Sequence, residues 1–173
     1  MSAFAAGNRI QLLRAGTEFF PALEAACEAA QREIYLETYI FEDDATGQRV
    51  GATLARAAAR GVAVHVMIDA FGSKGLGDDF LLALRAAGVR VLKYRPQISP
   101  WTLRRERLRR LHRKIVVIDA RIAFVGGINI IDDMHTPNQV PPRFDYAVRV
   151  EGPLLAPIHA AVVNLWTLVM WTQ

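Results

Sequence analysis

The chain has 173 residues, of which 52% are hydrophobic and 22% charged, and its formal net charge is +4. These values predict a globular domain with a proper hydrophobic core and exclude a disordered chain. The one cysteine, Cys27, excludes an intramolecular disulfide, and the first ten residues lack the basic segment and long apolar core of a signal peptide. We therefore expect a chain that works inside the cell.

Apolar strands alternate with helical patterns through the first half of the chain. Thr17 is the expected N-terminal cap of the first helix, and Gly61 and Gly88 are expected to end the next two. Alternation of this kind is typical of a sheet with helices packed on it. The predicted strands are Arg9–Leu13, Ile34–Phe41, Val62–Ile68 and Val89–Tyr94, and the predicted helices are Thr17 to about Gln31, Thr46–Arg60 and Asp78–Ala87.

The second half of the chain departs from this alternation. Strands predicted at Leu111–Ile118 and Ile122–Val125 are joined by the short turn Asp119–Arg121, and a strand at Tyr146–Val150 follows without a helix between them. Antiparallel strands therefore join the parallel ones. The sequence predicts an α/β fold whose mixed sheet is flanked by helices on both faces, formed by one domain over residues 8–173.

Polar residues stand at fixed spacing in the predicted hairpin. His112 and Lys114, two positions apart, share one face of a strand, whereas Asp119 lies at an odd offset from His112 and is interpreted as a turn residue, not a general base. Gly126 falls opposite Lys114, and the glycine pair 126–127 lets backbone N–H groups approach an anion. Asn129 can donate a further hydrogen bond. Together these residues predict a phosphate cradle.

The residue types in this cradle suit phosphodiester chemistry. Neutral imidazole can attack phosphorus and form a covalent phosphohistidine, which splits one displacement into two easier ones. Lys114 and Asn129 would stabilise charge on the non-bridging oxygens, and the loss of one such donor typically costs about 10²–10³ in rate. This chemistry requires no metal ion and no cofactor, and we expect neither.

The string HRKIVVIDARIAFVGGIN resembles the HxKx4Dx6G(G/S)xN signature of the phospholipase D superfamily. Gly127 stands where many members have serine, and this glycine version is most similar to bacterial cardiolipin synthases, in particular to their N-terminal half. The stretches LETYIFEDDATG, VHVMIDAFGS and RFDYAVRVEGP agree with the resemblance, which spans about Arg9 to Trp171. It implies a phospholipase D-like α/β/α sandwich.

The resemblance also implies roles for single residues. His112 would be the nucleophile or its partner acid, Lys114 would act with it, and Gly127 and Asn129 would bind the substrate phosphate. Asp119 would be a catalytic-motif residue with a mainly structural role.

Two further acids are candidates. Asp145 matches the family position that hydrogen-bonds the motif histidine, with an ordinary aspartate at a strand edge as the alternative. Glu37 is a possible site residue because a buried carboxylate needs a partner, and the alternative is that it faces solvent.

The family uses two histidines, one to attack phosphorus and one to protonate the leaving alcohol, and this sequence contains one HxK motif. His65, His135 and His159 are not followed two positions later by lysine and are expected to be structural. Either two copies meet about a twofold axis or the chain is the first half of a two-motif protein. We expect the latter, a half that folds but is catalytically incomplete.

A basic segment immediately precedes the motif. Leu103–Arg113 carries six arginines and one glutamate, a local charge of +5 against +4 for the whole chain. Near an anionic bilayer each such cation contributes about 1 kcal/mol, and Trp101 and Leu103 would add apolar contact. Acidic phospholipid is the expected partner. Nucleic acid would fit the same patch electrostatically and is the less favoured partner, although charge alone does not decide between them, and a merely solvated loop is the third option. Phe71–Gly75 is expected to be a rim loop of the site.

The resulting hypothesis is a cardiolipin synthase-type phosphatidyltransferase, which moves a phosphatidyl group from phosphatidylglycerol to a lipid alcohol. The alternatives are a phosphodiesterase or nuclease that uses water, and a catalytically incomplete half that binds anionic lipid. The expected location is peripheral, on the cytoplasmic side of the cell membrane. The last, mostly apolar helix, Leu154–Trp171, is expected to begin after Gly152 and to pack on the sheet rather than to span the membrane.

Overall fold

A seven-stranded sheet in the order β1-β7-β6-β5-β2-β3-β4 organises the chain. The computed structural model describes residues 5–95, 110–135 and 140–172. The strands in these ranges are β1 (Arg9–Arg14), β2 (Glu33–Thr38), β3 (Ala63–Asp69), β4 (Arg90–Tyr94), β5 (Ile115–Ile118), β6 (Ile122–Gly126) and β7 (Tyr146–Glu151). The helices are α1 (Ala15–Glu28), α2 (Ala45–Ala59), α3 (Asp78–Ala86) and α4 (Leu155–Trp171).

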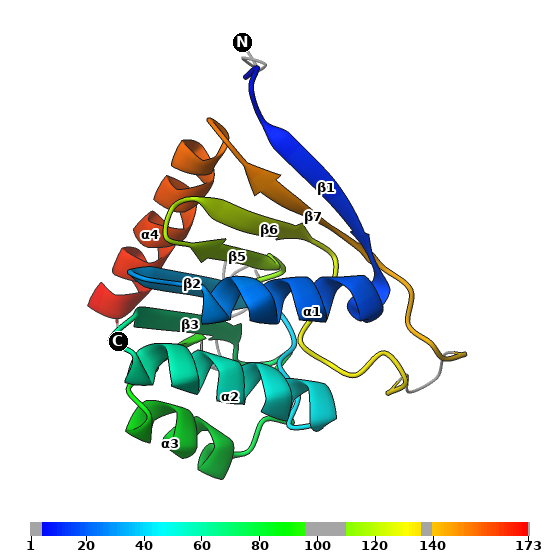
Figure 1. The fold of residues 1–173 in the computed structure, drawn as a ribbon. Helices are drawn as coiled ribbons and strands as arrows, with labels where there is room; N and C mark the ends of the chain where they lie inside the picture. Colours follow the sequence, from blue (N-terminus) through cyan, green and yellow to red (C-terminus); the bar gives the residue numbers. More distant parts are fainter. Residues whose placement is uncertain (1–4, 96–109, 136–139, 173) are drawn as a thin grey trace, which may run out of the picture.

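The sheet is mixed, as the sequence predicts. Strands β2, β3 and β4 are parallel because helical crossovers connect them, whereas β5, β6, β7 and β1 pair antiparallel. Helices α1 and α2 lie side by side over one face, and α4 covers part of the opposite face (Figure 1). The predicted α/β fold with helices on both faces is therefore confirmed.

The alternation of side chains along β2 divides the core between the two faces. Ile34 and Leu36 are buried in the larger cluster under α1 and α2, whereas Tyr35 packs in the clusters under α4. On α4, Val162 and Trp166 are buried against the sheet, so the prediction that this helix packs there is confirmed. Within the described residues, no helix has the length and apolarity needed to cross a bilayer.

The predicted cap of the first helix is wrong. Helix α1 begins at Ala15, and its N-cap residue Arg14 makes no capping hydrogen bond through its side chain. The free N–H groups of the first turn instead reach distant parts of the chain. Gly16 N donates to Oδ2 of Asp133 at 2.7 Å, and Ala15 N donates to the carbonyl of Asp145 at 2.8 Å. Tertiary acceptors therefore replace the local cap that Thr17 would have supplied.

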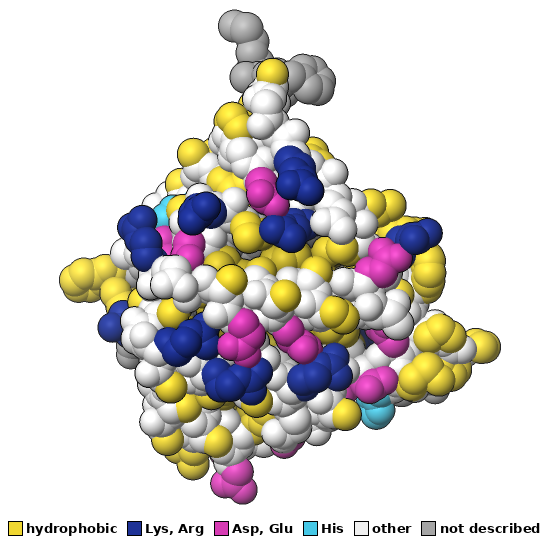
Figure 2. Space-filling model, in the orientation of Figure 1, with side chains coloured by type: hydrophobic (Ala, Val, Ile, Leu, Met, Phe, Trp, Pro, Cys, Tyr) yellow, Lys and Arg dark blue, Asp and Glu magenta, His cyan; other side chains and the backbone are white. Residues whose placement is uncertain are grey.

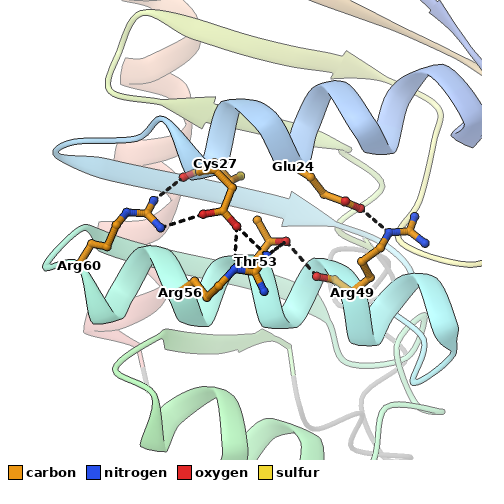
Figure 3. A network of polar contacts seen from close by, with 7 residues as sticks. Glu24, Cys27, Arg49, Thr53, Arg56 and Arg60 are labelled. Atoms are coloured by element: carbon orange, nitrogen blue, oxygen red, sulfur yellow. Dashed lines mark hydrogen bonds and ion pairs between the residues drawn. The ribbon is translucent and has the colours of Figure 1, made fainter.

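Charged side chains join α1 to α2 across the face that Figure 2 shows. Glu24 pairs with Arg49 at 2.6 Å, and Glu28 pairs with Arg56 at 2.6 Å and with Arg60 at 2.9 Å (Figure 3). Exposed pairs of this kind each contribute less than about 1 kcal/mol. Their consequence for function is that Arg49, Arg56 and Arg60 are already paired with carboxylates.

Candidate functional site

The predicted site residues gather where several strands end at one edge of the sheet. The C-terminal ends of β2, β3 and β6 meet the N-terminal ends of β5 and β7 there. Figure 1 shows the yellow segment after β6 and the orange segment before β7 at this edge. His112, Lys114, the glycine pair 126–127, Asn129 and Asp145 all belong to this edge, whereas Asp119 lies beyond the opposite end of β5.

The histidine and lysine of the motif contact each other. Nζ of Lys114 lies 3.3 Å from Nε2 of His112 and 3.3 Å from its backbone oxygen. An ammonium group has donors only, so the contact places a cation directly beside the ring nitrogen of the candidate nucleophile. His112 is exposed and Lys114 is buried. Burial lowers the pKa of Lys114, and the charge of Asp145 opposes this effect.

The motif segment is not a strand where the sequence predicts one. Strand β5 begins at Ile115, so His112 and Lys114 precede it, and β2 likewise ends at Thr38 rather than at Phe41. At the start of the predicted strand, the N–H of Leu111 donates to Oδ2 of Asp69 at 2.8 Å instead of to a neighbouring strand.

Asp69 is a site residue that the sequence reasoning missed. It is fully buried at the end of β3, and its Oδ1 accepts hydrogen bonds from the N–H groups of Phe71 and Gly72, each at 3.0 Å. One carboxylate thus anchors both the loop after β3 and the residue before His112. The available signal was an aspartate that closes an apolar strand, because a buried charge there needs partners.

Tyr39 is a second missed residue. Its ring centroid lies 5.0 Å from that of His112, and Nζ of Lys114 lies 5.4 Å from the centre of the same ring. The backbone oxygen of Tyr39 accepts a hydrogen bond from Ser73 Oγ at 3.1 Å. Oδ1 of Asn129 accepts the next N–H, that of Ile40, at 3.0 Å. Asn129 therefore holds the segment beside His112, and none of the described residues accepts a hydrogen bond from its Nδ2.

The glycine pair meets two different neighbours. Gly126 N donates to the carbonyl of Lys114 at 3.2 Å, which confirms the predicted register of the hairpin. A β-carbon on Gly126 would lie 2.5 Å from the Cα of Ala147, so close strand packing requires glycine. A β-carbon on Gly127 would lie 2.3 Å from Oδ1 of Asp145. The carboxylate of Asp145 thus occupies the space that a serine side chain would need.

The expected partnership between Asp145 and His112 is not found within this chain. Both residues are described, and no hydrogen bond joins them. Oδ1 of Asp145 instead accepts the N–H of Tyr146 at 2.7 Å, and the charge of Asp145 acts on Lys114. The carboxylate is therefore at the site but does not orient the imidazole of its own chain in this arrangement.

Asp119 lies in the turn that the sequence predicts, with both Asp119 and Ala120 at positive φ. Its Oδ1 accepts the N–H groups of Arg32 and Glu33 at 2.8 and 2.9 Å, and its Oδ2 accepts that of Gln31 at 2.9 Å. Burial raises the pKa of Asp119, but the three backbone donors together outweigh it and hold the pKa below its usual value. Asp119 thus anchors the start of β2, far from His112.

Glu37 does not face solvent, so that alternative is excluded. Its side chain is 3% exposed, Arg113 Nη2 donates to its Oε1 at 2.9 Å, and the same nitrogen lies 2.8 Å from Oε2. Since Arg113 stands between His112 and Lys114, this pair holds the motif segment from the side opposite Lys114.

Of the basic segment, only Arg110–Arg113 belongs to the described residues; Leu103, Trp101 and the other arginines lie outside them.

Burial raises the pKa of Glu37 from 4.5 to about 7, although the Arg113 guanidinium lowers it. The folded chain therefore holds this proton more tightly than the unfolded chain, and the free energy of unfolding should fall by about 2 kcal/mol as pH rises from 4.5 to 7. We expect Glu37→Gln to remove most of this slope. Urea unfolding across this pH range measures it, and Glu24→Gln, at a surface pair, is the matched control. Equal slopes in wild type and Glu37→Gln would contradict the assignment.

Comparisons with known proteins agree with this geometry. Residues 23–139 match the family described as "Cardiolipin synthase, PLD-like domain". Cardiolipin synthase B of Salmonella typhi is 47% identical over 152 residues, covering 88% of this chain and 37% of that protein. Cardiolipin synthase 1 of Bacillus anthracis is 32% identical over 157 residues, covering 90% and 31%. The chain thus spans about a third of the length of these relatives.

Solved structures agree on the fold. The phospholipase D family member Nuc from Salmonella typhimurium superposes with a TM-score of 0.68 at 18% identity, covering 96% of both chains. Phosphatidylserine synthase from Haemophilus influenzae gives a TM-score of 0.65 at 18% identity, covering 90% of this chain and 36% of that one. Fold and motif together define a phospholipase D-type domain. Within that class, the chain belongs to the cardiolipin synthase, PLD-like domain family.

Proposed function

We propose that this chain supplies one histidine of a two-histidine site that transfers a phosphatidyl group from phosphatidylglycerol to the hydroxyl of a second lipid. The observation that carries the proposal is the contact of Lys114 Nζ with Nε2 of His112 at 3.3 Å, because it places a cation that can bind a phosphate oxygen directly beside the imidazole that would attack phosphorus. The match to the cardiolipin synthase family supports this substrate class, and the proposed location is the cytoplasmic surface of the cell membrane.

The reaction proceeds in two displacements. Nε2 of His112 attacks phosphorus, the P–N bond forms as the P–O bond to glycerol breaks, and the leaving glycerol takes a proton from a second histidine. The hydroxyl of the acceptor lipid then returns a proton to that histidine as its oxygen attacks phosphorus and releases His112. Lys114 and Asn129 stabilise the charge that develops on the non-bridging oxygens.

The second histidine comes from another HxK motif, carried by a second copy of this chain or by a further half of the protein. The surface beside Asp145 suits such a partner. The rings of Phe144 and Tyr146 pack edge to face at 5.2 Å and are 64% and 48% exposed. A partner that covers these rings would place its own motif near Asp145, which makes no bond to His112 of its own chain.

An activated lipid tests the nucleophile without requiring the second histidine. In phosphatidyl-p-nitrophenol the leaving group departs without protonation, so we expect a stoichiometric burst of nitrophenolate and a phosphatidyl adduct on His112, located by mass spectrometry. Sedimentation equilibrium of the same sample identifies a dimer by twice the chain mass of 19.2 kDa. We expect natural phosphatidylglycerol to react only where two motifs are present.

Three results would overturn parts of the proposal. The absence of a burst, or an adduct on another residue, would exclude His112 as the nucleophile. Decay of the adduct to phosphatidic acid rather than cardiolipin, in vesicles rich in phosphatidylglycerol, would indicate a hydrolase. Turnover of phosphatidylglycerol by a monomer would exclude the need for a second motif.

A further inference from the structure

We propose that Phe71, Lys74 and Arg110, here termed the Phe71 rim, form the surface that this site presents to an anionic lipid bilayer. The inference rests on the proposed function and names the part of the chain that contacts the membrane. Its basis is the geometry of the loop between β3 and α3, together with the charges and contacts of its neighbours.

The Phe71 rim combines one exposed aromatic ring with two cations. Phe71 is 50% exposed, the guanidinium carbon of Arg110 lies 4.6 Å from its ring centroid, and Nζ of Lys74 lies 5.7 Å from the same centroid. An aromatic ring flanked by cations suits the boundary between headgroups and acyl chains, because the ring enters the apolar region while the cations contact phosphates.

The two cations of the rim have no carboxylate partner among the described residues. One guanidinium nitrogen of Arg110, Nη1, is buried and lacks any hydrogen-bond acceptor in that part of the chain. The contrast with the α1–α2 face is direct, since Arg49 and Arg56 are each paired with a glutamate there. The rim therefore offers two positive charges, and lipid phosphates are the complementary groups.

The rim is coupled to His112 through a short series of contacts. Asp69 binds the N–H groups of Phe71 and Leu111 with one carboxylate. A β-carbon on Gly72 would lie 2.8 Å from the ring of Tyr39, so this ring packs directly on the loop. The same ring lies 5.0 Å from His112. These contacts join the loop that carries Phe71 to the segment that carries His112.

Charge favours a lipid surface over a protein partner at this position. A protein partner would need carboxylates to match Lys74 and Arg110, whereas an anionic bilayer presents phosphates everywhere. In the sequence, four more arginines and one glutamate precede Arg110 within residues 103–109, so the segment that leads to the rim carries a positive charge. Cations that cluster beside one exposed ring are typical of interfacial anchoring.

Vesicle binding by the full chain in a His112→Ala background tests the rim independently of catalysis. Partition onto vesicles of phosphatidylglycerol and phosphatidylcholine is measured by sedimentation, with pure phosphatidylcholine as the neutral reference. We expect Phe71→Ala to weaken binding roughly tenfold and Lys74→Ala or Arg110→Ala roughly fivefold each, with the effect of the cations fading as salt rises.

The chain offers matched controls for both kinds of residue. Leu82 is 59% exposed on α3, and Arg121 is exposed in the turn at the opposite end of β5. Leu82→Ala and Arg121→Ala should leave partition unchanged. Cys27 is buried and its pKa is raised to about 12, so F71C can be labelled selectively with an environment-sensitive dye. We expect a blue shift on anionic vesicles for F71C and none for L82C.

Each outcome decides the inference. Equal losses for Phe71→Ala and Leu82→Ala, or an unshifted dye at position 71, would overturn it. Loss of self-association in Phe71→Ala without vesicles, with lipid binding retained, would assign the rim to a protein interface instead. If the wild-type chain bound vesicles through the rim but formed no phosphatidyl adduct, the membrane surface would be supported and the proposed transfer reaction would be contradicted.

Discussion

Replacing His112 by alanine is expected to reduce phosphatidyl transfer by at least about 10³-fold and to abolish the covalent adduct, because its imidazole is the proposed nucleophile. The free energy of unfolding should change by less than about 0.5 kcal/mol, since the imidazole is exposed. Adduct formation from phosphatidyl-p-nitrophenol measures the first effect, and urea unfolding measures the second.

His135→Ala is the matched control for this substitution. His135 is also exposed, but it lies in the loop after β6 and is not followed two positions later by lysine. Its loss should affect neither the burst nor stability. If His112→Ala kept a burst of wild-type size, the attacking group would have to be another residue.

Replacing Asp69 by alanine should destabilise the fold by about 3–5 kcal/mol. The carboxylate is 0% exposed and accepts three backbone N–H groups, those of Phe71, Gly72 and Leu111. Its removal leaves three donors without acceptors at a buried position. Urea unfolding gives the loss, and hydrogen exchange at the Leu111 amide should accelerate, because that N–H loses its acceptor.

Asp69→Asn separates the effect on folding from the effect on the site. One acceptor oxygen remains, so we expect an intermediate loss of stability and a slower burst with little change in lipid affinity. Asp79→Ala, at an exposed aspartate on α3, should cost less than about 1 kcal/mol. A stable Asp69→Ala chain with wild-type exchange at Leu111 would show that the carboxylate does not anchor the motif segment.

The local features of this protein followed from short-range sequence patterns. Periodicity predicted the order of strands and helices, the glycines after α2 and α3 marked their ends, and both Gly61 and Gly88 have positive φ. The hairpin register that places Gly126 opposite Lys114 was also predictable, because the turn at Asp119 determines it over a few residues.

The residues that organise the site were decided by tertiary structure. Asp69 accepts a hydrogen bond from Leu111, which is 42 residues away in the sequence. Arg113 and Glu37 are 76 residues apart, and Gly16 and its acceptor Asp133 are 117 residues apart. Local periodicity contains no information about such pairs, since it reports only which face a side chain occupies.

The sequence by itself therefore determined the family and the chemistry that we propose, because both depend on the residue types in one short motif. Only the tertiary structure decided how that motif is held. It shows that His112 and Lys114 precede β5 instead of lying in it, and that a buried carboxylate from β3 binds the N–H of Leu111, the residue before His112. A backbone donor removed from water requires some acceptor, and which acceptor it finds depends on how the whole chain packs.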